Sequence, residues 1–313
     1  MTTLNRRQWL KVTGVAAVGL PFISYAAPDL RAKARKNLKL GVFTGVYASL
    51  PLEEAARRIA ADGFHGVILE YGFADIRFDP WSPDWDKARQ IVRTLANHNL
   101  KVAGLFAYYN IVDPNATRRQ QGEQRMQVLM EHWKQLGSPI LSTETGTLNE
   151  KSEWLESPEN ATEKGYEACR AALVKLAQAA KKHGAILSIE PYWRNVIDSI
   201  ERADRIIRDV PGLKLVMDPC NYYRKEDLSR MDPMLEEMFR RLGKKIVLAH
   251  AKDVKASADG TDLPASGRGV LDYPLFLRLL AGLNREINLI IEHLTLDDVP
   301  RSRDYVLSQF DKI

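Results

Sequence analysis

The sequence contains little cysteine, and this scarcity limits the kind of scaffold that it can form. Only Cys169 and Cys220 occur among the 313 residues. A small domain held together by several disulfides is therefore excluded. Cys169 lies in a segment with apolar residues at helical spacing, and Cys220 follows an apolar run, so we expect two free thiols. The chain is long enough to bury one large hydrophobic core without covalent cross-links.

Long apolar runs are also missing. After the N-terminal leader, no stretch approaches the about 20 apolar residues that span a membrane. The leader places Arg6 and Arg7 before a short apolar segment, and Ser24 and Ala26 offer small residues where a signal peptidase cleaves. We predict a signal peptide over residues 1–26, followed by a single domain over 27–313 with no membrane span.

The two adjacent arginines indicate an export route. Together with Leu10 and Lys11, Arg6-Arg7 resembles the twin-arginine export motif. We therefore predict an exported, periplasmic protein that uses the twin-arginine route. An uncleaved membrane anchor and a basic amphipathic start are the alternative interpretations.

A large excess of one charge sign is absent as well. The chain carries 45 lysines and arginines against 40 aspartates and glutamates, a formal net charge of +5. Three of the basic residues, Arg6, Arg7 and Lys11, lie in the leader, so the remainder carries about +2. A near-neutral domain without a basic patch argues against a nucleic-acid partner. The sequence leaves the oligomeric state open, and a homo-oligomer is compatible with it.

What the sequence does contain is a regular alternation of two patterns. Segments with apolar residues at helical spacing, such as 52–62, 86–98, 166–183 and 273–283, separate short apolar runs. These runs, typical of parallel strands buried on both faces, cover 38–46, 65–70, 100–107, 139–144, 185–190, 213–218, 245–250 and 287–292. Eight strand–helix units predict an α/β fold, a closed (β/α)₈ TIM barrel. An open doubly wound sheet is the alternative, but GVFTGVY (41–47) lacks the glycine spacing of a dinucleotide-binding turn. The polar segment 145–165 is expected to form a loop at the rim.

Four of the predicted strands end on a residue that can bind a metal. These residues are Glu190, Asp218, His250 and Glu292. The carboxyl ends of barrel strands meet at one mouth, where three crowded carboxylates would repel one another without a cation. Taken singly, each residue is better explained as a turn former or helix cap, but that explanation does not account for four of them at successive strand ends. Three oxygen donors with one imidazole predict one divalent metal ion, with Mn²⁺, Mg²⁺, Co²⁺ and Zn²⁺ all suitable.

Several motifs around these positions resemble the sugar phosphate isomerase/epimerase family of the xylose isomerase-like TIM barrel superfamily. The resemblance covers nearly the whole domain. It is carried by Glu190-Pro191 with Asn195–Ser199, Met217-Asp218-Pro219 with Asn221, His250-Ala251-Lys252-Asp253, Gly267-Arg268-Gly269 with Asp272-Tyr273, and Glu292 with His293. The tagatose-epimerase-like branch has a substrate-binding His at the position of Asn221, so the chain departs from that branch.

The resemblance implies that Glu190, Asp218, His250 and Glu292 hold one divalent metal and that Glu190 and Glu292 also act as acid and base. We expect an isomerase or epimerase that removes a proton beside the carbonyl of a sugar or keto sugar and stabilises the enediolate on the metal. A 3-keto-glycoside lyase would use the same residues for β-elimination. An endonuclease IV-like enzyme would need more histidines at the mouth, and a non-catalytic sugar-binding barrel would need no metal shell.

Further residues near the predicted strand ends are candidates for substrate binding. Lys252 is expected either to contact a substrate oxygen or to pair with Asp253, and Arg268 either to hold a substrate group or to anchor its loop. Glu144 is expected at the mouth or in a loop hydrogen bond. His293 is expected to point away from the barrel interior. We also expect the small-molecule carbohydrate substrate to contact Asn221, Tyr192 and Trp193, the two aromatics by stacking on a sugar face.

Overall fold

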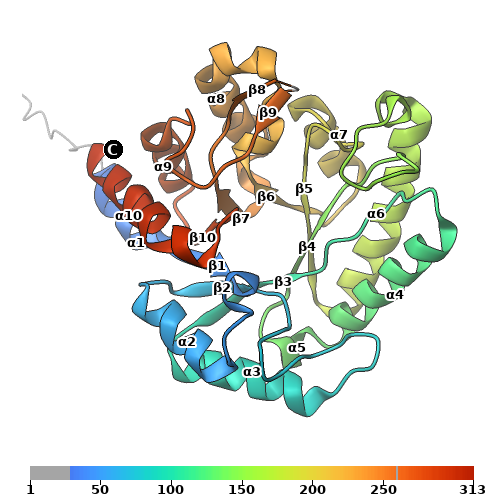
Figure 1. Ribbon diagram of the computed structural model, residues 1–313. Coiled ribbons are helices and arrows are strands. Elements are labelled where there is room, and N and C mark those ends of the chain that lie inside the picture. The colour runs from blue at the N-terminus through green and yellow to red at the C-terminus, as the bar shows by residue number, and fades with distance from the viewer. Residues whose placement is uncertain (1–28, 259) are drawn as a thin grey trace, which may run out of the picture.

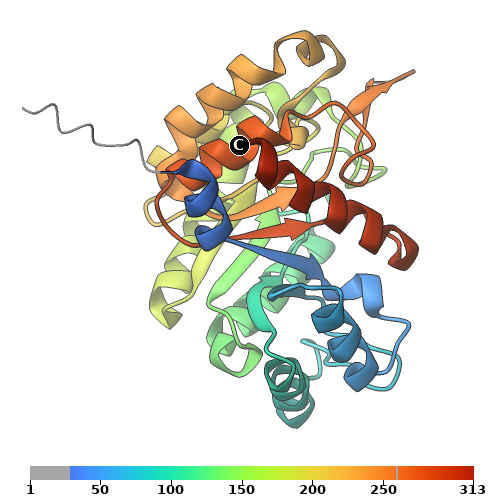
Figure 2. The same ribbon diagram turned by 90° about the vertical axis from the view of Figure 1, so that its left-hand side faces the viewer.

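The predicted barrel is confirmed. The computed structural model describes residues 29–258 and 260–313, and the predicted signal peptide 1–26 lies outside these residues. In the described residues, eight parallel strands close into a barrel in the order β1-β10-β7-β6-β5-β4-β3-β2. Helices surround the barrel, as Figure 1 shows in a view along its axis. Figure 2, turned by 90°, shows the barrel strands pointing toward one end of the molecule.

The strands lie close to the predicted apolar runs. They are β1 (Leu38–Phe43), β2 (Gly66–Leu69), β3 (Lys101–Phe106), β4 (Ile140–Glu144), β5 (Ile186–Glu190), β6 (Lys214–Met217), β7 (Ile246–Ala251) and β10 (Ile287–Ile291). The first predicted run extended to residue 46, but β1 ends at Phe43 because residues 44–47 form a 3-10 helix.

Ten α-helices are present in the described ranges. They are α1 (Leu30–Asn37), α2 (Leu52–Ala61), α3 (Trp85–Asn97), α4 (Ala116–Glu131), α5 (Trp133–Leu136), α6 (Glu163–His183), α7 (Ile200–Asp209), α8 (Met231–Leu242), α9 (Tyr273–Gly282) and α10 (Val299–Gln309). The segments predicted to be helical correspond to α2, α3, α6 and α9. The start of α6 is capped by the Thr162 side chain, which accepts from Gly165 N, and Gly184 ends the helix in the left-handed conformation with φ 68°.

One element was not expected from the sequence. Strands β8 (Lys255–Ser257) and β9 (Gly260–Asp262) form a small antiparallel pair outside the barrel, in the long connection between β7 and α9. Figure 2 shows this pair at the end of the molecule toward which the barrel strands point. The connection therefore adds structure beside the mouth of the barrel.

The hydrophobic core has two parts, because strand side chains alternate between the two faces of the barrel wall. A large cluster packs between the strands and the helices. A smaller one fills the barrel interior and consists of Ile68, Ala103, Val216, Leu248 and Ile290, with Phe43, Phe106 and Ile140 packed against it. The interior is thus a packed core below the mouth and not an open channel.

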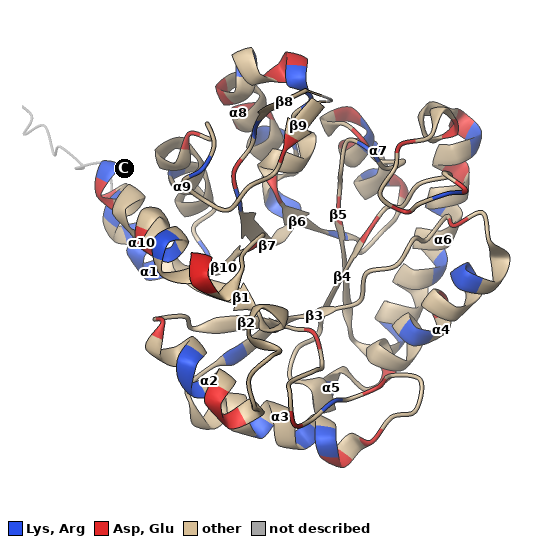
Figure 3. Cartoon of the chain, viewed as in Figure 1, with Lys and Arg blue, Asp and Glu red and all other residues tan. Residues whose placement is uncertain are grey.

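The distribution of charge on the outer helices agrees with the nearly balanced composition of the chain. In the view of Figure 3, basic and acidic residues are interspersed along the outer helices, as on α2 and α3. Among the described residues, no helix is both long and apolar enough to cross a membrane.

Cys169 and Cys220 are both buried and unbridged, so the prediction of two free thiols is confirmed.

Candidate metal centre

Strand alternation directs the predicted metal ligands into the mouth of the barrel. On β6, β7 and β10, an apolar side chain of the interior core is followed two residues later by a predicted ligand. The pairs are Val216 with Asp218, Leu248 with His250, and Ile290 with Glu292. Glu190 is the last residue of β5 and is buried like the other three. A period of two along neighbouring strands is sufficient to bring these side chains together.

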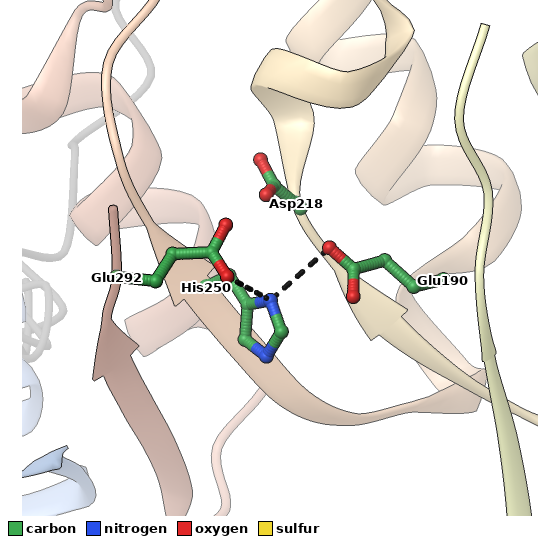
Figure 4. A group of neighbouring side chains, drawn as sticks. All are labelled: Glu190, Asp218, His250 and Glu292. Carbon is green, nitrogen blue, oxygen red and sulfur yellow. Dashed lines mark hydrogen bonds and ion pairs between the residues drawn. The ribbon is translucent and has the colours of Figure 1, made fainter. Parts of the chain in front are cut away.

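His250 lies between the two glutamates. Its Nδ1 atom is 3.1 Å from Glu190 Oε1 and 3.2 Å from Glu292 Oε2 (Figure 4). Asp218 completes the group, and one ligand atom of each residue lies within 4.8 Å of the others. Donors bound at about 2.1 Å to one cation lie up to about 4.2 Å apart. Small side-chain adjustments would therefore let all four residues bind one ion.

Lys252 is part of the same group. Its Nζ atom lies 2.7 Å from Asp218 Oδ2 and 2.7 Å from Glu292 Oε1, and the side chain is almost fully buried. The ion pair with Asp253 considered from the sequence is not formed. The Asp253 carboxylate instead accepts the backbone N–H groups of Val254, Gly267 and Leu271, which fixes the loop after β7.

The residues present fit a divalent cation. Asp218 Oδ2 and Glu292 Oε1 are buried and accept no hydrogen bond of normal geometry from the described residues, although Lys252 lies at ion-pair distance. Three ionised carboxyls and one ammonium leave two net negative charges when His250 is neutral. A bound divalent cation would neutralise this charge and supply a partner for both oxygens, so oxygen-preferring ions such as Mg²⁺ and Mn²⁺ suit the site.

The charges of the group are strongly coupled. Burial raises the pKa of Asp218 to about 8 against the opposing effect of Lys252. Burial alone would lower the pKa of His250, but the carboxylates of Glu190 and Glu292 outweigh it and raise that pKa well above its usual value. Burial would likewise raise the pKa of Glu292, but Lys252 and His250 hold it well below the usual range. Cations are thus strongly favoured between these carboxylates.

A cavity of 490 Å³ opens above this group and gives it access to a ligand. Of the residues predicted to bind substrate, Glu144, Tyr192, Asn221 and Lys252 line the cavity. Asn221 also donates from Nδ2 to Glu190 Oε1 at 2.9 Å, so it positions a metal ligand. Burial and the neighbouring Glu190 raise the pKa of Glu144 to about 8.

Two predicted substrate-binding residues lie outside the cavity. Arg268 is exposed, and its guanidinium pairs with Asp298, so the structure favours the loop-anchoring interpretation. Trp193 is 8% exposed and is covered by the guanidinium groups of Arg194 and Arg224, at 4.5 and 4.9 Å from its ring centroid. Its ring faces are therefore occupied by protein groups and do not face the cavity. Both residues lie on loops, and the path of a loop decides where their side chains point. The periodicity of the strands does not specify that path.

His293 was expected to point away from the barrel interior, and that expectation is wrong. The side chain lines the cavity, and its Nε2 atom lies 4.0 Å from Glu292 Oε1. The physical reason is the backbone: His293 has φ 57°, in the left-handed region, so the alternation of the strand stops at this residue. Its Nδ1 atom lies 2.5 Å from the carbonyl oxygen of Leu263.

Tyr108 and Glu70 also line the cavity, although neither was among the residues predicted to form the site. Tyr108 follows the interior residue Phe106 by two positions, and its hydroxyl donates to Glu190 Oε2. Glu70 directly follows β2, and its Oε2 atom accepts from Gly45 N at 2.6 Å. A Cβ at Gly45 would lie 2.3 Å from that oxygen, so a larger residue there would displace the Glu70 carboxylate from this position. The strand-end rule that identified the four ligands would also have identified both of these residues.

Comparison with known proteins assigns the chain to a family. A search of curated proteins gave no match. Similar solved structures include a xylose isomerase-like TIM barrel protein from Mycobacterium smegmatis in complex with magnesium, with TM-score 0.63 and 16% identity over 89% of this chain and 98% of that chain. The 3-keto-D-glucoside 4-epimerase from E. coli aligns with TM-score 0.62 and 16% identity over 88% and 100% of the two chains. An L-ribulose 3-epimerase gives TM-score 0.65 and 15% identity over 88% and 95%. At these identities the likeness shows the fold alone. The sequence profile of the xylose isomerase-like TIM barrel matches residues 56–306, and the chain therefore belongs to that family.

Proposed function

We propose that this protein is a divalent-metal-dependent isomerase or epimerase that acts on a sugar or keto sugar. The observation that carries the proposal is the buried group of Glu190, Asp218, His250 and Glu292 beside a 490 Å³ cavity. That volume is within the range of about 300–1,000 Å³ typical of small-molecule sites. Two solved structures of the same fold are named as sugar epimerases, and a third was crystallised with magnesium, which supports the proposal.

Glu190, Asp218, His250 and Glu292 would hold the metal. A divalent cation bound there supplies a positive charge next to the substrate carbonyl, which stabilises the negative charge that develops when a neighbouring C–H loses its proton. Mn²⁺, Mg²⁺, Co²⁺ and Zn²⁺ remain candidates.

Glu190 and Glu292 would move the proton. They approach His250 Nδ1 from two sides, at 3.1 and 3.2 Å, so a substrate carbon above the imidazole would have one carboxyl on each flank. One carboxylate would take the proton and the other carboxyl would return one on the opposite face, which inverts the carbon. General bases positioned in this way accelerate proton transfer by about 10² to 10⁴.

Neighbouring side chains would fix the orientation of Glu190. Tyr108 donates its hydroxyl to Oε2 and Asn221 donates its amide to Oε1, so both oxygens have a defined partner. Lys252 plays the corresponding part for Glu292 and Asp218. Tyr192, on the cavity wall, would stack on a sugar face.

Deuterium incorporation tests the proposal. Protein stripped of metal would be reloaded with each candidate cation and incubated in D₂O with a 3-keto-glucoside, and product and recovered substrate would be analysed by NMR. We expect the product or the recovered substrate to carry deuterium beside its carbonyl only when it was incubated with metal-loaded protein. Released aglycone would identify the elimination reaction, while an epimerised glycoside would identify the epimerase.

Glu190→Gln and Glu292→Gln supply the residue-specific part of that test. In each variant, saturated with metal, the rate of deuterium incorporation should fall by about a hundredfold or more. Glu286→Gln, at an exposed glutamate, is the matched control and should behave as the native protein. Normal incorporation in both active-site variants would show that these carboxyls do not carry the proton.

We also infer from residues 1–26 that the protein is exported to the periplasm by the twin-arginine route. The support is the arrangement of Arg6-Arg7, a short apolar segment and small residues before Ala27.

A further inference from the structure

A second cavity of 180 Å³ adjoins the cavity above the metal centre. The two share four lining residues, namely Phe106, Tyr108, Glu144 and Trp154. A volume of 180 Å³ is below the about 300 Å³ at which pockets hold a small molecule by themselves. The side cavity is therefore an extension of the main one, with Glu144 and Trp154 at the junction.

The junction presents apolar surface to solvent. Trp154, in the rim loop 145–165, lines both cavities and is 59% exposed. Phe106 and Tyr108 supply further aromatic surface, and their rings stack with centroids 4.9 Å apart. Exposed apolar surface gathered at a cavity is typical of a ligand-binding groove. An indole at this place can cover one face of a flat or ring-shaped ligand.

The rim loop holds Trp154 in place. Thr147 Oγ1 donates to the carbonyl oxygen of Leu155 at 2.8 Å, and Asn149 Nδ2 donates to that of Glu156 at 2.9 Å. The Glu156 side chain pairs with Arg224 at 3.1 Å. These contacts fix the two residues that directly follow Trp154, so the backbone that carries the exposed indole is held in place before a ligand binds.

The polar groups at the side cavity suit hydroxyls and not phosphates. The carboxyl groups of Glu144 and Glu153 line the side cavity and make no hydrogen bond or ion pair with described residues, so they can bind ligand hydroxyls. No arginine of the described chain lines either cavity, and the one lysine, Lys252, already pairs with two carboxylates. Phosphate sites depend on such cations. Among the described residues, the wall therefore offers no unpaired lysine or arginine to a negatively charged ligand.

We propose that the side cavity binds the second ring of a neutral glycoside, with Trp154 as its stacking surface and Glu144 at the linkage between the rings. The inference rests on the proposed function and narrows its substrate to a two-ring glycoside instead of a free monosaccharide or a sugar phosphate. The ring nearest the metal centre would carry the carbonyl. The second ring would lie between Trp154 and the wall formed by Phe106 and Tyr108.

Binding measurements on the magnesium-loaded protein test this substrate class. The probes are D-glucose, glucose 6-phosphate, and the two disaccharides maltose and cellobiose, which present both anomeric linkages. Calorimetry or ligand-observed NMR gives the dissociation constants. We expect at least one disaccharide to bind about tenfold more tightly than glucose, equivalent to about 1.4 kcal/mol. Glucose 6-phosphate should bind no more tightly than glucose.

Substitutions of Trp154 test whether the tighter binding of a disaccharide comes from the side cavity. Trp154→Ala should remove the tenfold advantage of the disaccharide and leave glucose binding unchanged, while Trp154→Phe should retain part of it. Trp81→Ala is the matched control, because Trp81 is 52% exposed and lines neither cavity. The proposal is overturned if neither disaccharide binds more tightly than glucose, if Trp154→Ala weakens both ligands equally, or if the phosphate binds best.

The outcome is separable from that of the proposed function. Disaccharide binding that depends on Trp154, without deuterium incorporation from D₂O into a 3-keto-glucoside, would support the subsite and reject the reaction. Incorporation into the keto-glucoside without any disaccharide advantage would reject the subsite and support the reaction.

Discussion

The ammonium group of Lys252 lies 2.7 Å from the carboxylate of Asp218, one of the four proposed metal ligands. Both side chains are almost completely buried. A cation of the protein and a bound metal ion would therefore act on the same carboxylate, and this relationship determines how the site responds to substitution.

Lys252→Met should make the protein more dependent on metal. Without the ammonium group, Asp218 and Glu292 lose their buried counter-charge, and breaking such a pair costs about 3–5 kcal/mol. The metal-free variant should unfold at a lower temperature than the metal-free native protein. Added Mn²⁺ should raise the Tm of the variant by more than it raises the Tm of the native protein. Thermal unfolding with and without Mn²⁺ measures both effects. Lys255→Met, at an exposed lysine, is the control, and an equal or smaller metal-induced rise in Lys252→Met would contradict the prediction.

Asp218→Ala should abolish metal binding while the barrel remains folded. The Asp218 carboxylate belongs to the buried ligand group and is placed at the end of β6, so its loss removes a donor without cutting a strand. Metal content measured after dialysis should fall to background, with an unchanged circular dichroism spectrum. Asp262→Ala, at an exposed position on β9, should retain the native metal content. Full metal occupancy in Asp218→Ala would show that the ligand set is wrong.

Asp113 should contribute pH-dependent stability. Burial raises the pKa of its carboxyl, but the hydrogen bonds from Arg118 and from Asn115 N outweigh burial and hold the pKa below the usual range. A lowered folded-state pKa stabilises the protein above the unfolded value of about 3.9, and this contribution is lost as the pH falls through the folded-state pKa.

A comparison with Asp113→Asn checks the direction of this pH dependence. Urea unfolding should show the native protein more stable than Asp113→Asn at pH 7, with the difference shrinking below about pH 4. Asp86→Asn, at an exposed carboxylate on α3, should show a much smaller difference. A difference that grows as the pH falls would contradict the assignment.

Cys169 and Cys220 should resist thiol reagents in the native protein. Both are buried, and burial raises the pKa of Cys169 to about 12, so the reactive thiolate is scarce at neutral pH. A colorimetric disulfide reagent should label no thiol rapidly before unfolding and two thiols in denaturant. Ser308→Cys, which places a thiol on an exposed part of α10, is the positive control. Rapid labelling of the native protein would show that one of the sites opens.

Replacing Arg6 and Arg7 by Lys should stop export. The twin-arginine route depends on the arginine pair, so a charge-preserving change should leave the precursor in the cytoplasm. Cell fractionation and immunoblotting in a bacterium with an intact twin-arginine system measure the distribution. The pair Arg31→Lys and Arg35→Lys, outside the leader, should leave the distribution unchanged. Equal periplasmic recovery of the Arg6 and Arg7 variant would point to a different route.

The sequence by itself determined the barrel and the group at its mouth. Short apolar runs alternating with helical spacing predicted eight strands, and each is present within a few residues of its predicted bounds. The position of Glu190, Asp218, His250 and Glu292 at the carboxyl ends of predicted barrel strands also predicted that they would meet at one mouth, and the structure brings all four together. The first inference uses local periodicity and the second uses the residue at which each apolar run ends, and both are written directly in the order of the residues.

Tertiary structure alone decided what surrounds that group. The pairing of Lys252 with Asp218 depends on the distance between two strands, and the pairing of Arg268 with Asp298 depends on the packing of a loop against a distant turn. The left-handed backbone at His293 redirects a side chain that strand alternation would turn away from the interior. Contacts of this kind are set by barrel closure and by loop packing between residues far apart in the chain, so no local pattern in the sequence specifies them.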